Sequence, residues 1–185
     1  MPITIAQLNG IPGLKEPLAE DLDFCLSDSA EDAVWFRVQG PESFEPIAKE
    51  GAGGVFLIGH KTGVVLYVTS EGSAGVIANS LAEFLQLSIA HPYWKDLLKF
   101  SGDGKLSEIK RAAQFLEQDL LDEFPDIEEK KAALYERLDL LPGKDPISAL
   151  HHAVNTLGSS IKVLAPDDWE CGSLFNTFML RTVGN

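Results

Sequence analysis

Two apolar runs near the middle of the chain form its clearest pattern of hydrophobic and polar positions. Residues 54–60 (GVFLIGH) and residues 64–69 (VVLYVT) are almost continuously apolar, and the segment Lys61-Thr62-Gly63 separates them. Two such runs joined by a short segment that contains glycine are typical of a β-hairpin. Because polar residues do not alternate with apolar ones, we expect this antiparallel pair at the centre of a sheet, with both faces largely covered.

Helical spacing of apolar residues is common in the rest of the chain. Leu18, Leu22 and Leu26 recur every four residues, which predicts a short amphipathic helix over residues 17–26 with an acidic outer face. Residues 33–38 (AVWFRV) are rich in β-branched and aromatic side chains, which predicts a strand. The same two patterns predict further helices over residues 77–90, 93–100, 106–124, 126–140 and 146–157, and strands over residues 161–164 and 174–180.

Together these elements predict an α+β fold, in which a mainly antiparallel sheet with the hairpin at its centre packs against several helices. The chain has 185 residues, which is near the ordinary size of one domain. Hydrophobic residues make up 45% of it, which is enough to build a core. Since no internal repeat, low-complexity tract or long linker interrupts the sequence, we expect residues 1–185 to form a single domain.

Acidic residues outnumber basic ones by 28 to 15, which gives a net charge of −13. A field of this sign opposes binding to phosphates, so we expect no nucleic acid partner. The surplus lies in two blocks: residues 16–45 hold nine acids and one base, and residues 106–145 hold eleven acids and six bases. Such blocks either keep a surface solvated or form a docking surface for a basic protein.

The sequence gives no sign of secretion or membrane insertion. Its first residues lack the basic flank and apolar run of a signal peptide, and no stretch approaches about 18 consecutive apolar residues. Cys25 and Cys171 are too few for a disulfide scaffold, and we expect both to be buried structural thiols. We therefore expect a cytoplasmic protein that does not bind a membrane.

Histidines and tryptophans are the other side chains considered for a site. His151 and His152 are adjacent on a predicted helix and would point about 100° apart, which disfavours a shared metal. We expect one at the margin of the core and the other in solvent, and we predict no metal or cofactor. Of Trp35, Trp94 and Trp169, any that is exposed becomes a candidate interface anchor.

A loop rich in glycine and serine follows the second strand of the hairpin and suggests two enzyme classes. A phosphate-binding loop would need a lysine that is absent here, and Glu71 would repel phosphate. A nucleophile elbow at Ser73 would need a glycine where Glu71 stands. Ser73 is better explained as a helix N-cap, so we predict no catalytic residue. The alternative is a small hydrolase with a site near Ser73 or among the cysteines and histidines.

Several segments of the central region resemble the SUKH superfamily, in particular its Smi/Knr-like branch, which includes proteins similar to a cell-wall glucan-synthesis regulator. The resemblance covers roughly residues 35–100 and is carried by residues 44–48 (FEPIA), 51–56 (GAGGVF), 65–72 (VLYVTSEG), 77–78 (IA) and 81–85 (LAEFL). It implies a SUKH-like core at about residues 17–100, a helical elaboration at residues 105–157 and C-terminal strands at residues 160–181. It also implies a non-enzymatic binding domain, which in many bacterial members is an immunity protein that neutralises a toxin by direct contact.

The resemblance and the charge together predict the kind of partner. Secreted nuclease toxins tend to be basic, and an acidic surface would speed association with one. The expected partner-binding residues are Asp28, Glu31, Asp32 and Glu71, with Trp35 as an apolar anchor. A third hypothesis is a regulatory scaffold protein that docks through residues 105–157. The sequence leaves the oligomeric state open.

Overall fold

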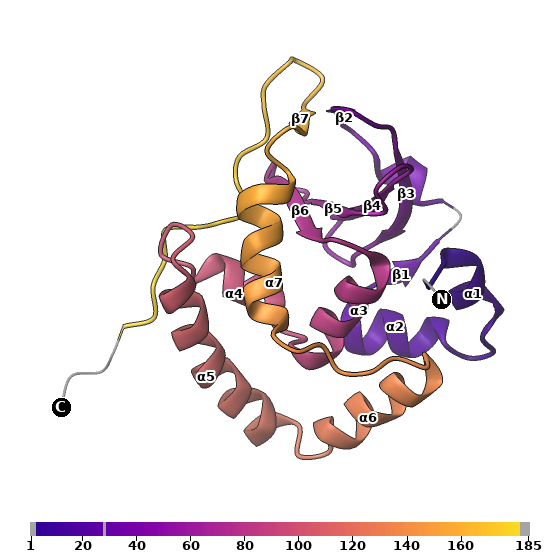
Figure 1. The fold of residues 1–185 in the computed structure, drawn as a ribbon, viewed down its shortest axis with the longest axis vertical. Coiled ribbons are helices and arrows are strands. Elements are labelled where there is room, and N and C mark those ends of the chain that lie inside the picture. The colour runs from indigo at the N-terminus through magenta and orange to yellow at the C-terminus, as the bar shows by residue number, and fades with distance from the viewer. Residues whose placement is uncertain (1–2, 28, 182–185) are drawn as a thin grey trace.

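The computed structural model describes residues 3–27 and 29–181, and within them it shows an α+β fold (Figure 1). All neighbouring strands of the main sheet pair antiparallel, in the order β1-β3-β4-β5-β6. A smaller sheet pairs β2 with β7, also antiparallel. The strands are β1 (Cys25–Leu26), β2 (Arg37–Gln39), β3 (Phe44–Lys49), β4 (Val55–Gly59), β5 (Val65–Val68), β6 (Ala74–Ala78) and β7 (Lys162–Leu164).

Helices cover one face of the main sheet and fill most of the second half of the chain. The α-helices are α1 (Ile5–Gly10), α2 (Lys15–Leu22), α3 (Leu81–Ala90), α4 (Trp94–Lys99), α5 (Leu106–Glu123), α6 (Ile127–Arg137) and α7 (Pro146–His152). A 3-10 helix, η1 (Ala30–Ala33), precedes β2, and a π-helix, η2 (Ala153–Leu157), continues α7. These elements confirm the predicted fold class.

The predicted hairpin is confirmed as strands β4 and β5. Their register runs from the pair Val55 and Val68 to the pair Ile58 and Val65. Every residue of β5 is buried, and β4 is buried except at Ile58, which is half-buried. Both faces of the hairpin are therefore covered, as the continuous apolar runs predicted.

Alternate side chains of the central strands point into two different cores. Phe56, Tyr67 and Ile77 point toward the helices, where they join residues from α2, α3, α4, α6 and α7. Leu66 and Val76 point the other way, toward β2, β7 and η2. A sheet buried on both faces explains why neither strand of the hairpin alternates with polar residues.

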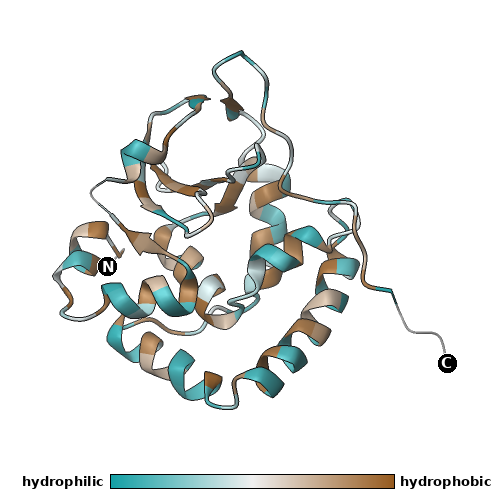
Figure 2. Ribbon diagram, turned by 180° about the vertical axis from the view of Figure 1, so that it is seen from behind, coloured by the Kyte–Doolittle hydropathy of each residue, from teal (hydrophilic) through white to brown (hydrophobic). Residues whose placement is uncertain are grey.

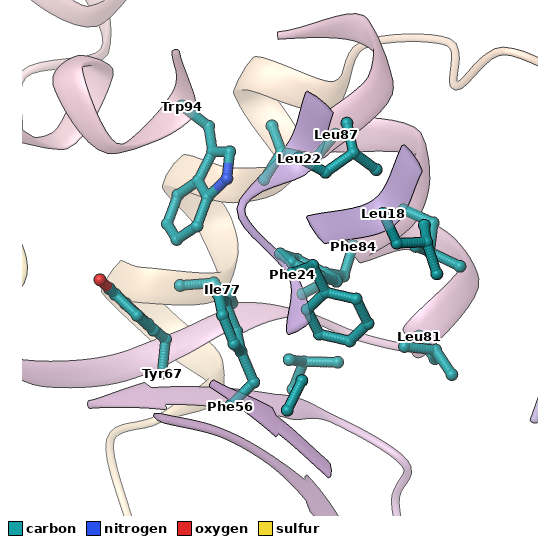
Figure 3. Packing of buried hydrophobic residues seen from close by; sticks show 14 of the residues in the cluster. Leu18, Leu22, Phe24, Phe56, Tyr67, Ile77, Leu81, Phe84, Leu87 and Trp94 are labelled. Carbon is teal, nitrogen blue, oxygen red and sulfur yellow. The ribbon is translucent and has the colours of Figure 1, made fainter. Parts of the chain in front are cut away.

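Aromatic rings fill the centre of the core on the helical side (Figure 3). Phe56 of β4 stacks on Tyr67 of β5 with 4.9 Å between ring centroids, and it meets Phe24 edge-on at 5.1 Å. Trp94 of α4 meets Tyr67 edge-on at 5.3 Å. Such ring pairs stabilise a core beyond the area that they bury, so they hold α3 and α4 firmly against the sheet.

Helices α5 and α6 extend away from the sheet and form an arc around the lower part of the molecule (Figure 1). Figure 2 shows that hydrophilic residues occupy much of both helices, while the strands are mostly hydrophobic. The predicted helices over residues 106–124 and 126–140 correspond closely to α5 and α6. Nowhere in the described part of the chain is a helix both long and apolar enough to cross a membrane.

Two boundaries in the first quarter of the chain differ from the predictions. The helix predicted over residues 17–26 ends at Leu22, because Asp23 takes a left-handed conformation with φ of 50° and Cys25–Leu26 then pairs with β3. The strand predicted over residues 33–38 begins only at Arg37, since the chain before it winds into η1.

The helix predicted from residue 77 begins at Leu81, and the residues before it form a strand. Ala74–Ala78 pairs with β5 as β6, and Ser80 caps α3 by accepting a hydrogen bond from the Glu83 N–H at 3.2 Å. The interpretation of Ser73 as a helix N-cap is therefore wrong. Residues 74–78 form a strand because they pair with β5, although the spacing of Ile77 and Leu81 is typical of a helix.

The C-terminal part of the chain also departs from the predictions. β7 confirms the strand over residues 161–164, but residues 174–180 contain no strand. This segment instead crosses the turn between α4 and α5, where Gly102 N–H donates to the Phe178 carbonyl and Asp103 N–H donates to the Asn176 carbonyl. The predicted helix over residues 146–157 changes from α to π geometry after His152.

Candidate protein-binding surface

The three tryptophans differ sharply in exposure. Trp94 is 1% exposed and belongs to the aromatic core, whereas Trp35 is 37% exposed and Trp169 is 55% exposed. Trp35 packs edge-on against the buried ring of Phe36, with 5.6 Å between centroids. Phe36 thus contacts Trp35 from the side of the core, and about a third of Trp35 remains exposed.

An ion pair joins the segment of Trp35 to the loop that carries Trp169. Arg37 of β2 pairs with Asp168, and Arg37 also lies opposite Leu164 in the register of β2 and β7. The Ala165 N–H donates to the Trp169 carbonyl at 2.8 Å, so the loop turns back directly after β7. The segment before β2 and the loop after β7 therefore meet at one end of the small sheet.

The same loop contacts the turn between β5 and β6. A Cβ added to Gly72 would lie 2.8 Å from Cζ3 of Trp169, so the indole rests directly on the Gly72 backbone. Gly72 has φ of 87°, a conformation that favours glycine, and its carbonyl accepts from the Gly172 N–H at 2.8 Å. This contact brings Glu71 next to the loop of Trp169.

Exposed carboxylates lie close to each tryptophan in the chain or across the Gly72 contact. Glu31, Asp32, Glu71 and Asp167 are exposed and form no ion pair with any lysine or arginine that the structure describes. In the same loop, by contrast, Asp168 pairs with Arg37 and Glu170 pairs with Lys162. We call the set Glu31, Asp32, Trp35, Glu71, Asp167 and Trp169 the two-tryptophan surface.

The structure brings together part of the predicted partner-binding set. Trp35 and Glu71 reach the same end of the molecule through the loop of Trp169. Glu31 and Asp32 lie on η1, next to Trp35 in the chain, and η1 packs against β3. Asp28 lies outside the described residues.

Trp169 and Asp167 were not in the predicted set, although Trp169 is the most exposed tryptophan. Trp169 stands in the run Asp167-Asp168-Trp169-Glu170, where no apolar neighbour supports a place in the core. An aromatic residue isolated among acids is a usable sequence signal for an exposed anchor. Its contact with Gly72 joins residues almost one hundred positions apart and has no such signal.

Ser73, the candidate nucleophile of the alternative function, lines a pocket of about 380 Å³ beside Glu71. Lys95, Lys99 and Thr69 line it as well, and Thr69 Oγ1 accepts from the Ser73 N–H at 3.0 Å. No histidine of the described chain lines this pocket. A serine nucleophile needs a base within hydrogen-bond reach, and this pocket does not present an imidazole.

The predicted positions of the paired histidines are confirmed. His151 is half-buried and its Nε2 hydrogen-bonds the Gly104 carbonyl at 2.9 Å, while His152 is exposed. Among the residues that the structure describes, no three His, Cys, Asp or Glu side chains gather closely enough to hold a metal ion.

The expectation that both cysteines are buried is wrong, because Cys25 and Cys171 are each half-buried. Cys171 lines a separate pocket of about 240 Å³ between β6, η2 and the loop after β7. Partial burial and the nearby Glu170 carboxylate raise the pKa of the Cys171 thiol. A raised pKa reduces the thiolate form that a nucleophilic cysteine needs.

A network of charged side chains lies behind the Ser73 pocket. Tyr67 Oη donates to the buried Glu50 carboxylate at 2.7 Å, and Lys95 pairs with Glu50 and also with Asp23 at 2.7 Å. Burial alone would lower the pKa of Lys95, but the hydrogen bonds to Asp23 and Glu50 raise it. Burial and the hydrogen bond to Glu50 raise the pKa of Tyr67, so the phenol stays protonated. These groups satisfy one another and stabilise the wall of the pocket.

We compared the chain with protein-family models, with curated proteins and with solved structures, and none of the three comparisons found a match.

Proposed function

We propose that this chain is a non-enzymatic, cytoplasmic protein-binding module that neutralises a basic toxin by direct contact through the two-tryptophan surface. The proposal combines the acidic composition of the chain with the resemblance of its central region to SUKH immunity proteins. The partner is a protein and not a nucleic acid, because the field of the chain repels phosphate.

One observation carries the proposal. Trp35 and Trp169 are partly exposed, each is supported from behind by the fold, and unpaired carboxylates lie beside both. Interface hot spots are enriched in tryptophan side chains that are already held in place before binding. Carboxylates around such anchors attract a basic partner and speed its association.

The proposal is tested by affinity capture from the native cell extract, with quantitative identification of the captured proteins. We expect the unsubstituted protein to capture a basic protein that the double reversal Glu31→Lys/Asp32→Lys fails to capture. The matched control reverses Glu129 and Glu136, which are exposed on α6 and form no ion pair within the described chain. This control should capture the partner normally.

The outcome that contradicts the proposal is equal capture by the unsubstituted protein and the Glu31→Lys/Asp32→Lys variant. An ester and phosphate substrate screen with Ser73→Ala, Cys171→Ala and His152→Ala tests the hydrolase alternative. Turnover that one of these substitutions abolishes in a folded protein would favour the hydrolase over the binding module.

A further inference from the structure

We infer that the two-tryptophan surface takes an arginine side chain of its basic partner, which stacks on Trp169 and pairs with the carboxylates of Glu71 and Asp167. The inference rests on the proposed function and names the chemical group that anchors the partner. It is carried by the position of the Trp169 ring, by the two free carboxylates and by the way in which this loop already binds one arginine.

The Trp169 ring is held in place on one side and open on the other. The six-membered ring of the indole lies against the Gly72 backbone, where a Cβ would be 2.8 Å from Cζ3 and 3.3 Å from Cη2. More than half of the side chain is nevertheless exposed. An open indole surface attracts a cation, and tryptophan is the strongest aromatic partner for this interaction.

Glu71 and Asp167 supply negative charge near the Trp169 ring. Glu71 directly precedes Gly72, on which the ring rests, and Asp167 accepts a hydrogen bond from the backbone N–H of Trp169 at 3.3 Å. Both carboxylates are exposed, and neither pairs with a lysine or arginine in the described part of the chain. They are therefore available to a cation that lies on the indole.

Neighbouring carboxylates of this loop already bind cations of the chain, a guanidinium at Asp168 and an ammonium at Glu170. Asp168 pairs with Arg37, so a guanidinium already binds the loop from the side of β2. That pair uses Asp168 and leaves Asp167 and Glu71 for a second cation. Glu71 also lines the pocket that contains Lys95 and Lys99, whose charges disfavour a cation inside the pocket. The partner therefore approaches from the side of Trp169.

Arginine fits this arrangement better than lysine. A planar guanidinium can stack on an indole and still donate hydrogen bonds in its own plane to carboxylates. A lysine ammonium is a compact, strongly hydrated charge and cannot do both with the same geometry. The surface should thus distinguish two peptides of equal charge.

The experiment uses two synthetic peptides of equal length, in which three arginines or three lysines alternate with glycine. Binding is followed by NMR through the indole N–H resonances of Trp35 and Trp169. We expect the arginine peptide to shift the Trp169 resonance and to bind at least about threefold more tightly than the lysine peptide. Equal affinity for the two peptides, or shifts confined to Trp35, would overturn the inference.

Substitutions identify the groups responsible. Trp169→Leu should abolish the preference for the arginine peptide. Glu71→Gln/Asp167→Asn, which changes exposed residues, should lower the affinity for the arginine peptide about tenfold. The matched control is Phe124→Leu, which changes an aromatic residue of similar exposure at the end of α5 and should leave both affinities unchanged. An arginine preference that persists in both surface variants would contradict the inference.

Extract capture separates failure of this inference from failure of the proposed function. If the Trp169→Leu variant still captures the basic protein that Glu31→Lys/Asp32→Lys loses, the binding function stands and the arginine anchor is wrong. If neither variant changes capture, the proposed function itself is wrong.

Discussion

The two acidic blocks of the chain differ in what their carboxylates contact. Within residues 106–145, four of the six lysines and arginines pair with acids of the same block, in the pairs Lys110–Asp145, Arg111–Glu108, Lys130–Asp126, Lys131–Glu117 and Lys131–Glu128. In the described part of residues 16–45, Asp23 is the one acid that forms an ion pair, with Lys95. Five acids of the second block have an internal cation, against one described acid of the first block, so net charge alone does not locate a binding surface.

Some carboxylates form ion pairs and others have no partner, but Glu42 is held by hydrogen bonds and forms no ion pair with the residues that the structure describes. It accepts hydrogen bonds from the Lys61 N–H at 2.6 Å and from the Thr62 N–H at 3.1 Å, and it fixes the turn of the hairpin. The Thr62 hydroxyl also donates to it, and these bonds lower the pKa of Glu42. The described acids of the first block that have neither an ion pair nor hydrogen bonds of this kind lie on α2, η1 and β3. Of these elements, η1 lies next to Trp35 in the chain, so the proposed surface includes it.

The largest expected effect comes from breaking the buried pairing of the helical block. Lys131 is 8% exposed and joins α6 to Glu117 of α5 at 3.0 Å. Lys131→Ala should lower the free energy of unfolding by about 3 kcal/mol, because it leaves Glu117 without its cation. Glu31→Gln/Asp32→Asn should change it by less than about 0.5 kcal/mol. Urea denaturation measures both, and similar losses would contradict the contrast between the two blocks.

An intermediate effect is expected where the two-tryptophan surface depends on a glycine. Gly72→Ala should lower the free energy of unfolding by about 2 kcal/mol, because the alanine would have to adopt a positive φ and its Cβ would displace Trp169. Gly63 is the matched control: its φ is 76° and no atom lies within 4 Å of an added Cβ. Gly63→Ala should cost about 1 kcal/mol, from the backbone alone.

A double-mutant cycle sharpens this comparison. In a Trp169→Leu background, Gly72→Ala should cost no more than Gly63→Ala, since the displaced ring is gone. Denaturation that shows the same cost of Gly72→Ala in both backgrounds would mean that the ring contact has no energetic role.

A smaller effect, dependent on pH, is expected where His91 and Tyr93 contact the second acidic block. His91 Nδ1 hydrogen-bonds Tyr93 Oη, which donates to Glu117, and Lys131 completes this chain of contacts. Burial lowers the pKa of His91 below 6.5, and the nearby Lys131 lowers it further, although Glu117 and Asp145 oppose the shift. The folded state thus favours the neutral imidazole. The contribution of His91 to the free energy of unfolding is fully present above pH 6.5, and it is lost as the pH falls through the lower pKa of His91 in the folded state.

Glu117 extends the same trend to more acidic pH. Burial alone would raise its pKa, but the hydrogen bonds from Tyr93 and Lys131 outweigh it and lower the pKa below 4.5. Stability therefore declines again below pH 4.5. Unfolding free energies measured from pH 7 to about pH 2 should show both declines, and His91→Gln should remove the first. An unchanged profile in His91→Gln would contradict this assignment.

Elements defined by local pattern were predictable from the sequence. The hairpin has two continuous apolar runs and a glycine turn, and α5 and α6 have helical spacing with Pro125 between them. The elements that were missed depend on distant partners. β6 becomes a strand because β5 lies beside it, and residues 174–180 follow the turn between α4 and α5 instead of a neighbouring strand.

The candidate site was predictable only in part for the same reason. Composition and aromatic character pointed to Glu31, Asp32 and Trp35, whose setting is local. The neighbourhood of Glu71 is created by Trp169, and no local pattern links residues that far apart in the chain. The sequence likewise could not show which acids have internal partners.

The crossing of residues 174–180 over the turn at Ser101 has a practical consequence for any shortened version of the protein. Ser101 is fully buried, and its hydroxyl donates to the Asn176 carbonyl at 2.9 Å, beside the two backbone groups bound by Asn176 and Phe178. Cutting the chain at residue 173 would leave three donors at this turn without acceptors. It would also remove Phe175 and Leu180, which pack against α4 and α5, and would expose the apolar side chains that they cover. A minimal fragment for crystallisation or fusion should therefore retain the chain through Leu180.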